Sequence, residues 1–331
     1  MLYQDEFIHR LRVLLQAALP EWGLDAGSEL SLLTVSENAT WLAVDPLSQR
    51  RLVLRVHRPD YSSAEEIRSE LAWIQALRAA GTVDTAAPVP RLDGGLVGHL
   101  PDQGTLRHVV AFEFVPGHEP SLSGGLKQRY AELGRINAAL HNHSRRWRKP
   151  AGFVRKRWDF STIIGERARW GDWRHAPGLA PEGMRILERA AALLKKQTDA
   201  YGQDPARFGL VHCDMRLANL LVDGPRMTVI DFDDCGGCWY MYDFAAAVSF
   251  IEEDPRIGEF LAAWLEGYRS VAPLGADDEA AIPMFLMLRR MQLTAWIASH
   301  GETSTAQSMG PDYTRGTVSL AERYLGLHLK G

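Results

Sequence analysis

Three short strand-like runs rich in apolar residues lie near the start of the chain, and in the third, residues 52–57, the side chains alternate between two faces with a period of two. This pattern is typical of half-buried β-strands. The runs cover residues 30–35, 40–44 and 52–57, and polar turn-forming residues separate them. A helix is predicted over 64–80, because Ser63 and Glu66 form a capping-box sequence and Gly81 follows the last apolar position.

The period of the apolar positions changes after Pro116-Gly117. Residues 126–141 carry apolar side chains three or four positions apart, which is the spacing of one face of a helix. Most of the following chain is also expected to be helical, apart from a hairpin-like island at 219–231. The sequence therefore predicts an α+β fold, with a β-rich part at 1–115 and a mainly helical part at 116–331.

Composition and charge exclude several classes of protein. The chain has 331 residues, of which 46% are hydrophobic and 24% charged, with a formal net charge of −4. These values are ordinary for a globular protein and give no general attraction to nucleic acid or to an anionic membrane. The first residues lack the features of a signal peptide, and three cysteines do not suggest a disulfide framework. We expect a cytoplasmic protein with no nucleic-acid and no membrane partner; its oligomeric state is not predicted.

Polar side chains flank the predicted hairpin at 219–231. His212, Asp214 and Asn219 precede its first strand or begin it, and Asp231 follows its second strand. Because a hairpin returns the chain on itself, Asn219 and Asp231 are expected to lie close together. Their oxygens suit Mg²⁺ and phosphate chemistry. Two other interpretations stay open from the residues alone: a helix cap followed by a solvated turn, and a metallohydrolase site.

The H-x-D-x-x-x-x-N sequence, the hairpin and the D-F-D that follows it resemble the aminoglycoside phosphotransferase and choline kinase superfamily. The resemblance spans nearly the whole chain. It implies a protein-kinase-like two-lobed fold, with a nucleotide-binding lobe at 1–115 and a helical lobe at 116–331 that carries the catalytic loop and the acceptor site. ATP and Mg²⁺ are the implied cofactors, and a small-molecule hydroxyl substrate is the implied partner.

The resemblance also assigns roles to individual residues. It implies that Asp214 is the catalytic base and that Asn219 and Asp231 bind Mg²⁺. His212 would brace the catalytic loop. Asp243 would accept hydrogen bonds from the backbone of that loop.

An ion pair in the first half of the chain is predicted independently of this motif. Glu70 falls inside the apolar stripe of the helix at 64–80, where a carboxylate is costly unless it is paired. Arg55, on the preceding strand, is the expected partner. By resemblance the two form the phosphate-gripping pair of kinase-like enzymes, with Arg where the family most often has Lys. The alternative places Arg55 at the surface with its charged end in solvent.

Two further segments are implied to bind the nucleotide. Ser36 and Asn38 lie in the turn between the first two strands, which covers the phosphates in the resembled family. By the same resemblance, Glu113 and Val115 would belong to the inter-lobe hinge, where backbone groups of residues 113–115 would bind adenine. Taken without the resemblance, the same residues fit an ordinary hairpin turn and the end of an edge strand.

The remaining candidate residues have less specific patterns. Cys235 and Cys238 form a C-x-x-C pair, with Cys213 as a third thiol. Packing behind the site is the expected role, and a redox role is left open. Arg289 and Arg290 adjoin on a helix rich in Met and Leu, where one of them could grip a carboxylate or phosphate and at least one is expected at the surface.

Together these features predict an ATP-dependent phosphotransferase that moves the γ-phosphoryl group to a hydroxyl of a small molecule. Residues 153–175 contain five Arg and one Lys against three acidic residues, which argues against a polycationic aminoglycoside as acceptor. Two alternatives remain. One is a protein Ser/Thr kinase of the bacterial stress-response type. The other is a nucleotide-binding pseudokinase, which the intact Asp214, Asn219 and Asp231 disfavour and the replacement at Arg55 leaves open.

Overall fold

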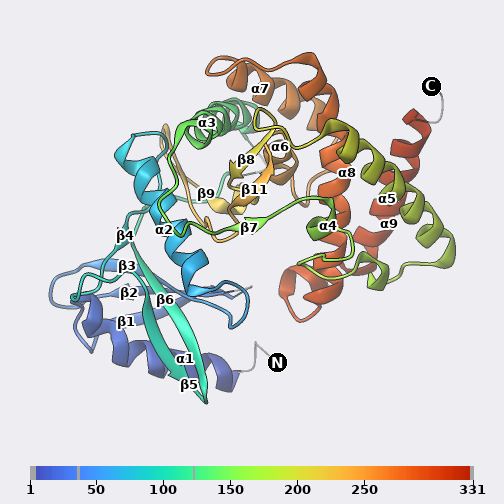
Figure 1. The fold of residues 1–331 in the computed structure, drawn as a ribbon. Coiled ribbons are helices and arrows are strands. Elements are labelled where there is room, and N and C mark those ends of the chain that lie inside the picture. Colours follow the sequence, from blue (N-terminus) through green and yellow to red (C-terminus); the bar gives the residue numbers. More distant parts are fainter. Residues whose placement is uncertain (1–4, 36–37, 122–123, 329–331) are drawn as a thin grey trace. The chain divides into compact units, whose positions relative to one another are not determined.

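A computed structural model describes residues 5–35, 38–121 and 124–328 (Figure 1). The chain divides into two compact units. Unit 1 comprises Met1–His118, Lys149–Arg155 and Leu221–Asp233, and unit 2 comprises Glu119–Arg148, Lys156–Leu220 and Asp234–Gly331. The antiparallel sheet of the N-terminal part and the helices of the C-terminal part give the predicted α+β architecture.

Unit 1 is built on an antiparallel sheet with the strand order β1-β2-β3-β6-β4, and β5 pairs with β6 as well. The strands predicted in the first 60 residues are confirmed, with boundaries that differ by one residue. The strands are β1 (Glu29–Val35), β2 (Ala39–Val44), β3 (Arg51–Val56), β4 (Pro88–Val89), β5 (Gly98–Asp102) and β6 (Thr105–Glu113).

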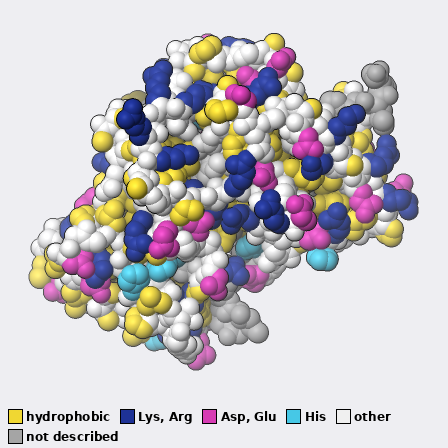
Figure 2. Space-filling model, viewed as in Figure 1, with side chains coloured by type: hydrophobic (Ala, Val, Ile, Leu, Met, Phe, Trp, Pro, Cys, Tyr) yellow, Lys and Arg dark blue, Asp and Glu magenta, His cyan; other side chains and the backbone are white. Residues whose placement is uncertain are grey.

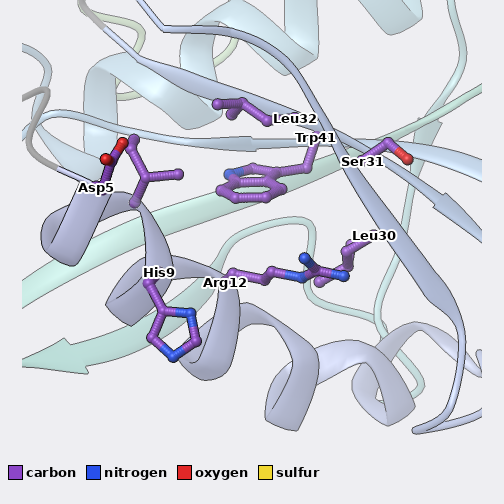
Figure 3. Close-up of a pocket in the computed structure, with 8 residues that line it drawn as sticks. Asp5, His9, Arg12, Leu30, Ser31, Leu32 and Trp41 are labelled. Carbon is purple, nitrogen blue, oxygen red and sulfur yellow. The ribbon is translucent and has the colours of Figure 1, made fainter.

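One face of this sheet packs against α1 (Asp5–Ala18), and the alternation along β3 places Leu52, Leu54 and Val56 in the shared core. Each such buried aliphatic side chain contributes about 1.5–3 kcal/mol to folding. A hollow of about 360 Å³ lies beside this core, with residues of α1, β1 and β2 around it. Figure 3 shows the indole ring of Trp41 lining the hollow together with side chains from α1 and β1.

Helix α2 (Ala64–Ala79) begins at the predicted capping box. The Ser63 amide donates to Glu66 at 2.9 Å, and the Glu66 amide donates to the Ser63 hydroxyl at 3.2 Å. The first four N–H groups of a helix have no partner within the helix, and the capping box supplies partners for two of them. The predicted apolar stripe of α2 is buried, and Glu70 is buried with it.

The predicted hairpin is also present. Strands β9 (Leu220–Asp223) and β10 (Arg226–Val229) pair with each other, and Gly224 in their turn has a φ of +58°. Residues 221–233 join unit 1 through hydrogen bonds between His118 and Val222 and between Asp84 and Val229. The buried side chains of Val222 and Val229 agree with the apolar pattern of both strands.

Unit 2 contains a small sheet with the strand order β7-β11-β8 and a set of packed helices. Its strands are β7 (Lys156–Arg157), β8 (Phe208–Val211) and β11 (Gly236–Trp239). Its helices are α3 (Leu126–Arg146), α4 (Phe160–Ile163), α5 (Pro181–Tyr201), α6 (Tyr242–Ala247), α7 (Ile257–Arg269), α8 (Ala276–Ser299) and α9 (Ser304–His328).

Helices α3 and α7 approach closely because both carry glycine at the crossing. A Cβ atom on Gly134 would lie 2.0 Å from the carbonyl oxygen of Trp264, and one on Gly267 would lie 1.8 Å from that of Ala131. Real side chains do not tolerate such distances, so only glycine fits at either position.

Helix α8 is buried on all sides over most of its length, as expected for a helix without a polar face. Figure 1 shows it among the other helices of unit 2, and it contacts α5, α6 and α9. The prediction that Arg289 or Arg290 lies at the surface is wrong: their relative exposures are 1% and 2%. Of the helices in the described ranges, none combines the length and the apolar character needed to cross a membrane.

The surface carries charges of both signs. On the face drawn in Figure 2, Lys and Arg side chains are interspersed with Asp and Glu side chains. Some charged side chains of the protein form exposed pairs within one helix, such as Lys195 with Asp199 in α5. Pairs of this kind contribute little to stability, about 0.3–0.5 kcal/mol each.

Candidate active site

The predicted ion pair between β3 and α2 is present in unit 1. The Nη2 atom of Arg55 lies 2.6 and 2.8 Å from the two carboxylate oxygens of Glu70. The relative exposures of the two side chains are 6% and 0%, so the surface alternative for Arg55 is wrong. Burial alone would lower the pKa of Arg55, but the carboxylates of Glu70, Asp233 and Asp231 outweigh it and raise this pKa, which keeps the guanidinium charged.

Arg55 also contacts the residue predicted to bind metal. Its Nη1 atom donates to Asp231 at 3.2 Å, and 47% of the Asp231 side chain is exposed. Asp231 has a φ of +61°, a left-handed conformation that costs a non-glycine residue about 1–3 kcal/mol. Such strain persists where the surrounding structure holds it, and here the neighbouring Phe232 and Asp233 are both buried.

Helix α2 holds the segment that carries Asp231. Trp73 of α2 meets Phe232 edge to face, with ring centroids 5.5 Å apart. Arg155 donates to the carbonyl oxygen of Glu66 in α2 at 2.9 Å and to that of Asp233. The same helix that positions Arg55 through Glu70 therefore also positions Asp231.

Asn38 forms hydrogen bonds with Asp233 and with Arg58. Its side-chain amide donates to Asp233 at 2.9 Å, and its carbonyl oxygen accepts from the Arg58 amide at 3.2 Å. Because both ends of the side chain are used within the protein, a contact of this turn with a nucleotide would fall to the backbone. That role for Asn38 stays a prediction, and Ser36 lies outside the described residues.

In the predicted hinge, two of three backbone amides already have partners. The Glu113 amide donates to the carbonyl oxygen of Ala87 at 2.9 Å, and the Phe114 amide donates to that of Arg51 at 3.3 Å. The carboxylate of Glu113 pairs with Arg50 at 2.9 Å. Among the described residues, no backbone partner of the Val115 amide is found, so this amide is the one we propose as a donor to adenine.

The predicted catalytic loop lies in unit 2. The Asp214 amide donates to Nδ1 of the buried His212 at 3.3 Å, which is the bracing contact expected of that histidine. Asn219 donates its side-chain amide to the Asp214 backbone oxygen at 2.8 Å and to its Oδ2 at 2.9 Å. Because the nitrogen of Asn219 faces Asp214, its side-chain oxygen is the atom that it can offer to a metal.

Asp243 anchors this loop from α6, as predicted. Its Oδ1 accepts the Cys213 amide at 3.3 Å, and its Oδ2 accepts from Asn137 at 3.1 Å and from His141 at 3.0 Å. Burial lowers the pKa of His141, although the Asp243 carboxylate opposes that effect. Since a carboxylate only accepts, Nε2 of His141 is the donor, and Nδ1 faces the hydroxyl of Tyr268 at 3.0 Å.

Asn137 and His141 belong to the site although the sequence did not single them out. They lie four residues apart on α3, on the side of the helix that Asp243 contacts. Both are fully buried. The sequence did contain a signal for them, namely two polar residues one helical turn apart in a buried stripe. Because buried polar groups require partners, such a pair indicates a contact with another polar group.

Like Asn137 and His141, Arg289 lies in the candidate active site although the sequence did not predict that position. It was expected to grip a carboxylate or phosphate, and the carboxylate that it contacts is that of Asp214 itself. Helix α8 shows no amphipathic pattern that would have directed Arg289 towards the catalytic loop.

The three thiols are reduced and buried. Burial, with Cys238 and Asp243 nearby, raises the pKa of Cys213 well above its ordinary value, so this thiol is protonated at neutral pH. Among the described residues, no group of three or more His, Cys, Asp or Glu side chains is arranged to hold a metal ion.

The predicted site residues thus fall into two groups. Arg55, Glu70 and Asp231 are in contact in unit 1, and Asp214 and Asn219 are in contact in unit 2. Because Asn219 and Asp231 belong to different units, their expected proximity stays a prediction.

Comparison with known proteins identifies the family. A model of the phosphotransferase enzyme family matches residues 32–274, which is more than half of the chain. The chain belongs to the phosphotransferase enzyme family. It is 45% identical to a microcompartment-associated aminopropanol kinase of known structure, with a TM-score of 0.88 over 95% of this chain and 98% of that one.

More distant relatives agree with this assignment. Amicoumacin kinase of Bacillus subtilis strain 168 is 24% identical over 298 residues, which cover 86% of this chain and 84% of the relative. The amicoumacin kinase hAmiN, solved with AMP-PNP, Ca²⁺ and Ami, has the same fold, with a TM-score of 0.76 at 20% identity over 96% of this chain and 94% of that one. The protein-kinase-like fold is thereby confirmed, and the chain is a kinase that phosphorylates an alcohol group.

Proposed function

We propose that this enzyme transfers the γ-phosphoryl group of ATP to the hydroxyl group of a small amino alcohol, in the presence of Mg²⁺. The observation that carries the reaction is the Asp214 carboxylate, held by Asn219 in a loop that Asp243 anchors. The identity of 45% with an aminopropanol kinase over nearly the full length of both chains supports the class of acceptor.

In unit 1 we assign the nucleotide to Arg55 and the hinge. Glu70 uses one arm of the Arg55 guanidinium, and the other arm lies next to the half-exposed Asp231. A guanidinium in this place supplies a fixed positive charge and planar donors for phosphate oxygens, where a lysine would supply a point charge. The Val115 amide would bind adenine.

The donor atoms of the site suit Mg²⁺. Asn219 offers a side-chain oxygen and Asp231 a carboxylate, and Mg²⁺ is usually held by one or two protein oxygens together with substrate phosphates. When bound, the ion neutralises negative charge on the phosphates. A hydrogen bond keeps each residue in place: Asn219 donates to Asp214, and Asp231 accepts from Arg55.

In unit 2, Asp214 would accept a hydrogen bond from the acceptor hydroxyl and take its proton during transfer. Transition states of phosphoryl transfer are loose, so the enzyme contributes mainly position and charge stabilisation. A positioned base typically contributes a factor of about 10²–10⁴ to the rate.

The test is a panel of acceptors scored for ADP release: an aminopropanol, ethanolamine, choline, homoserine and an aminoglycoside. We expect turnover with the short amino alcohols, and we expect Asp214→Ala to lose at least ~10²-fold in kcat while still binding nucleotide. Asp199→Ala, an exposed aspartate in the same unit, is the matched control and should keep full activity. Full activity of Asp214→Ala would contradict the assignment of the base.

The same preparation tests the two alternative functions. Stress response kinase A of Salmonella typhi is 26% identical over 288 residues, so labelled ATP should also be offered to a protein extract. Transfer of label to protein without transfer to any amino alcohol would favour a protein kinase. Nucleotide binding without turnover on any acceptor would favour a pseudokinase.

A further inference from the structure

A buried guanidinium contacts the carboxylate of Asp214. Arg289 projects from α8, where its exposure is 1%, and its Nη2 atom donates to Oδ1 of Asp214. Its Nη1 atom lies 3.4 Å from the carbonyl oxygen of Cys213, the residue that precedes Asp214. Arg289 therefore contacts both the side chain and the backbone of the predicted catalytic loop.

The other donors of Arg289 are also held by the protein. Nε donates to the hydroxyl of Ser249 at 2.9 Å, and Nη1 lies 3.3 Å from the side-chain oxygen of Gln292. The rings of Trp170 and Tyr242 lie 4.9 and 5.9 Å from the guanidinium carbon. A guanidinium with every nitrogen engaged in this way is fixed in place, which suits it to hold a protein carboxylate rather than to follow a mobile ligand.

Both oxygens of the Asp214 carboxylate are thereby restrained from within unit 2. Oδ1 accepts from Arg289, and Oδ2 accepts from the side-chain amide of Asn219 at 2.9 Å. The terminal torsion of an aspartate is otherwise broad, with no sharply preferred angle. Arg216 also lies 3.5 Å from Oδ2. Contacts on both oxygens select one orientation of the carboxylate plane.

We propose that Arg289 is a positioning residue for phosphoryl transfer: it fixes the Asp214 carboxylate in the orientation that receives the acceptor hydroxyl. This inference rests on the proposed role of Asp214 as the base. Its energetic basis is that a buried guanidinium is costly without an opposite charge, and Asp214 supplies that charge. A base whose oxygens are displaced by about 1 Å can lose ~100-fold in rate.

The neighbouring Arg290 provides a matched control. It is equally buried on the same helix, but its nitrogens pair with Glu252 at 2.8 Å, Glu253 at 3.0 Å and Thr317 at 2.8 Å. Removing either arginine leaves buried acceptors without a donor, so both variants lose stability. Only the loss of Arg289 also removes the donor to Oδ1 of Asp214, while Asn219 and Arg216 stay beside Oδ2.

The experiment compares Arg289→Met, Arg289→Lys and Arg290→Met, with kcat and KM measured separately for ATP and for an aminopropanol. We expect Arg289→Met to lose ~100-fold in kcat with KM for ATP within about twofold of the parent enzyme. Arg289→Lys keeps the charge without the planar fork and should recover part of kcat. Arg290→Met should lose thermal stability without a selective loss of kcat.

The outcomes distinguish a failure of the positioning role of Arg289 from a failure of the proposed role of Asp214 as the base. A kcat for Arg289→Met within twofold of the parent would overturn the positioning role, as would equal losses of kcat in the Arg289 and Arg290 variants. If Arg289→Met does not fold, Arg289→Lys decides, because an unchanged kcat there overturns the proposal as well. Full activity of Asp214→Ala would instead refute the proposed base, whatever the arginine variants show.

Discussion

The replacement Glu70→Ala tests the ion pair on which the nucleotide half of the site depends. It removes the carboxylate that holds Nη2 of Arg55 at 2.6 and 2.8 Å and leaves the guanidinium in a buried position. The half-exposed Asp231, at 3.2 Å from Nη1, would stay as an ion-pair partner, and the carboxylate of Asp233 would still act on the guanidinium. A charge that stays buried with a weaker partner destabilises the folded state.

The magnitude follows from the burial of both partners. Loss of one member of a buried pair typically costs about 3–5 kcal/mol. An exposed pair is worth only about 0.2–1 kcal/mol, and Glu65 with Arg68 on the same helix forms such a pair at 3.3 Å. We therefore expect Glu70→Ala to lower the free energy of unfolding by about 3 kcal/mol or more, and Glu65→Ala to change it by less than about 0.5 kcal/mol.

The assay is urea unfolding followed by tryptophan fluorescence, together with KM for ATP. The double variant Arg55→Met/Glu70→Leu replaces the pair by apolar groups and should recover most of the stability lost in Glu70→Ala. It should not recover activity, because the charge at residue 55 is gone. A loss below about 1 kcal/mol in Glu70→Ala, or an active double variant, would refute this reasoning.

Two further predictions concern unit 2. Gly267→Ala should destabilise the protein by about 2 kcal/mol or more in urea unfolding despite the better helix propensity of alanine, because its Cβ would lie 1.8 Å from a backbone oxygen. Gly258→Ala on the same helix meets nothing within 4 Å, and an equal effect of the two would contradict the close helix crossing. Burial raises the pKa of Tyr268 from 10.0 to about 12, so its contribution to stability is complete below pH 10 and lost as the pH rises through about 12. Absorbance at 295 nm should show Tyr268→Phe lacking one late-titrating tyrosine, and an unchanged titration curve would refute the assignment.

Local patterns in the sequence were enough to predict the first three strands of unit 1, helix α2 and the hairpin of β9 and β10. Apolar runs bounded by turn residues located the strands, and the alternation along β3 identified Leu52, Leu54 and Val56 as one face, which packs on the core. The capping box located the start of α2, and Glu70 in an apolar stripe indicated Arg55 as its partner. Each of these inferences depends on residues close in sequence or on a charge that burial would penalise.

Long-range contacts within buried helices could not be predicted in the same way. Arg289 is 75 residues from Asp214, and its helix is buried on every side over most of its length, so no periodicity indicates which neighbour a given side chain faces. Asn137 and His141 contact Asp243 across more than 100 residues. The pairing of such groups is decided by helix packing, which the one-dimensional pattern does not encode.

The measurement that tests the central claim most directly is ³¹P NMR of the enzyme with ATP, Mg²⁺ and an aminopropanol. The proposed function predicts ADP and a phosphomonoester of the amino alcohol in equal amounts, with both signals lost in Asp214→Ala and retained in Asp199→Ala. Release of ADP and inorganic phosphate without the phosphomonoester, or formation of the ester by Asp214→Ala at the parent rate, would contradict it.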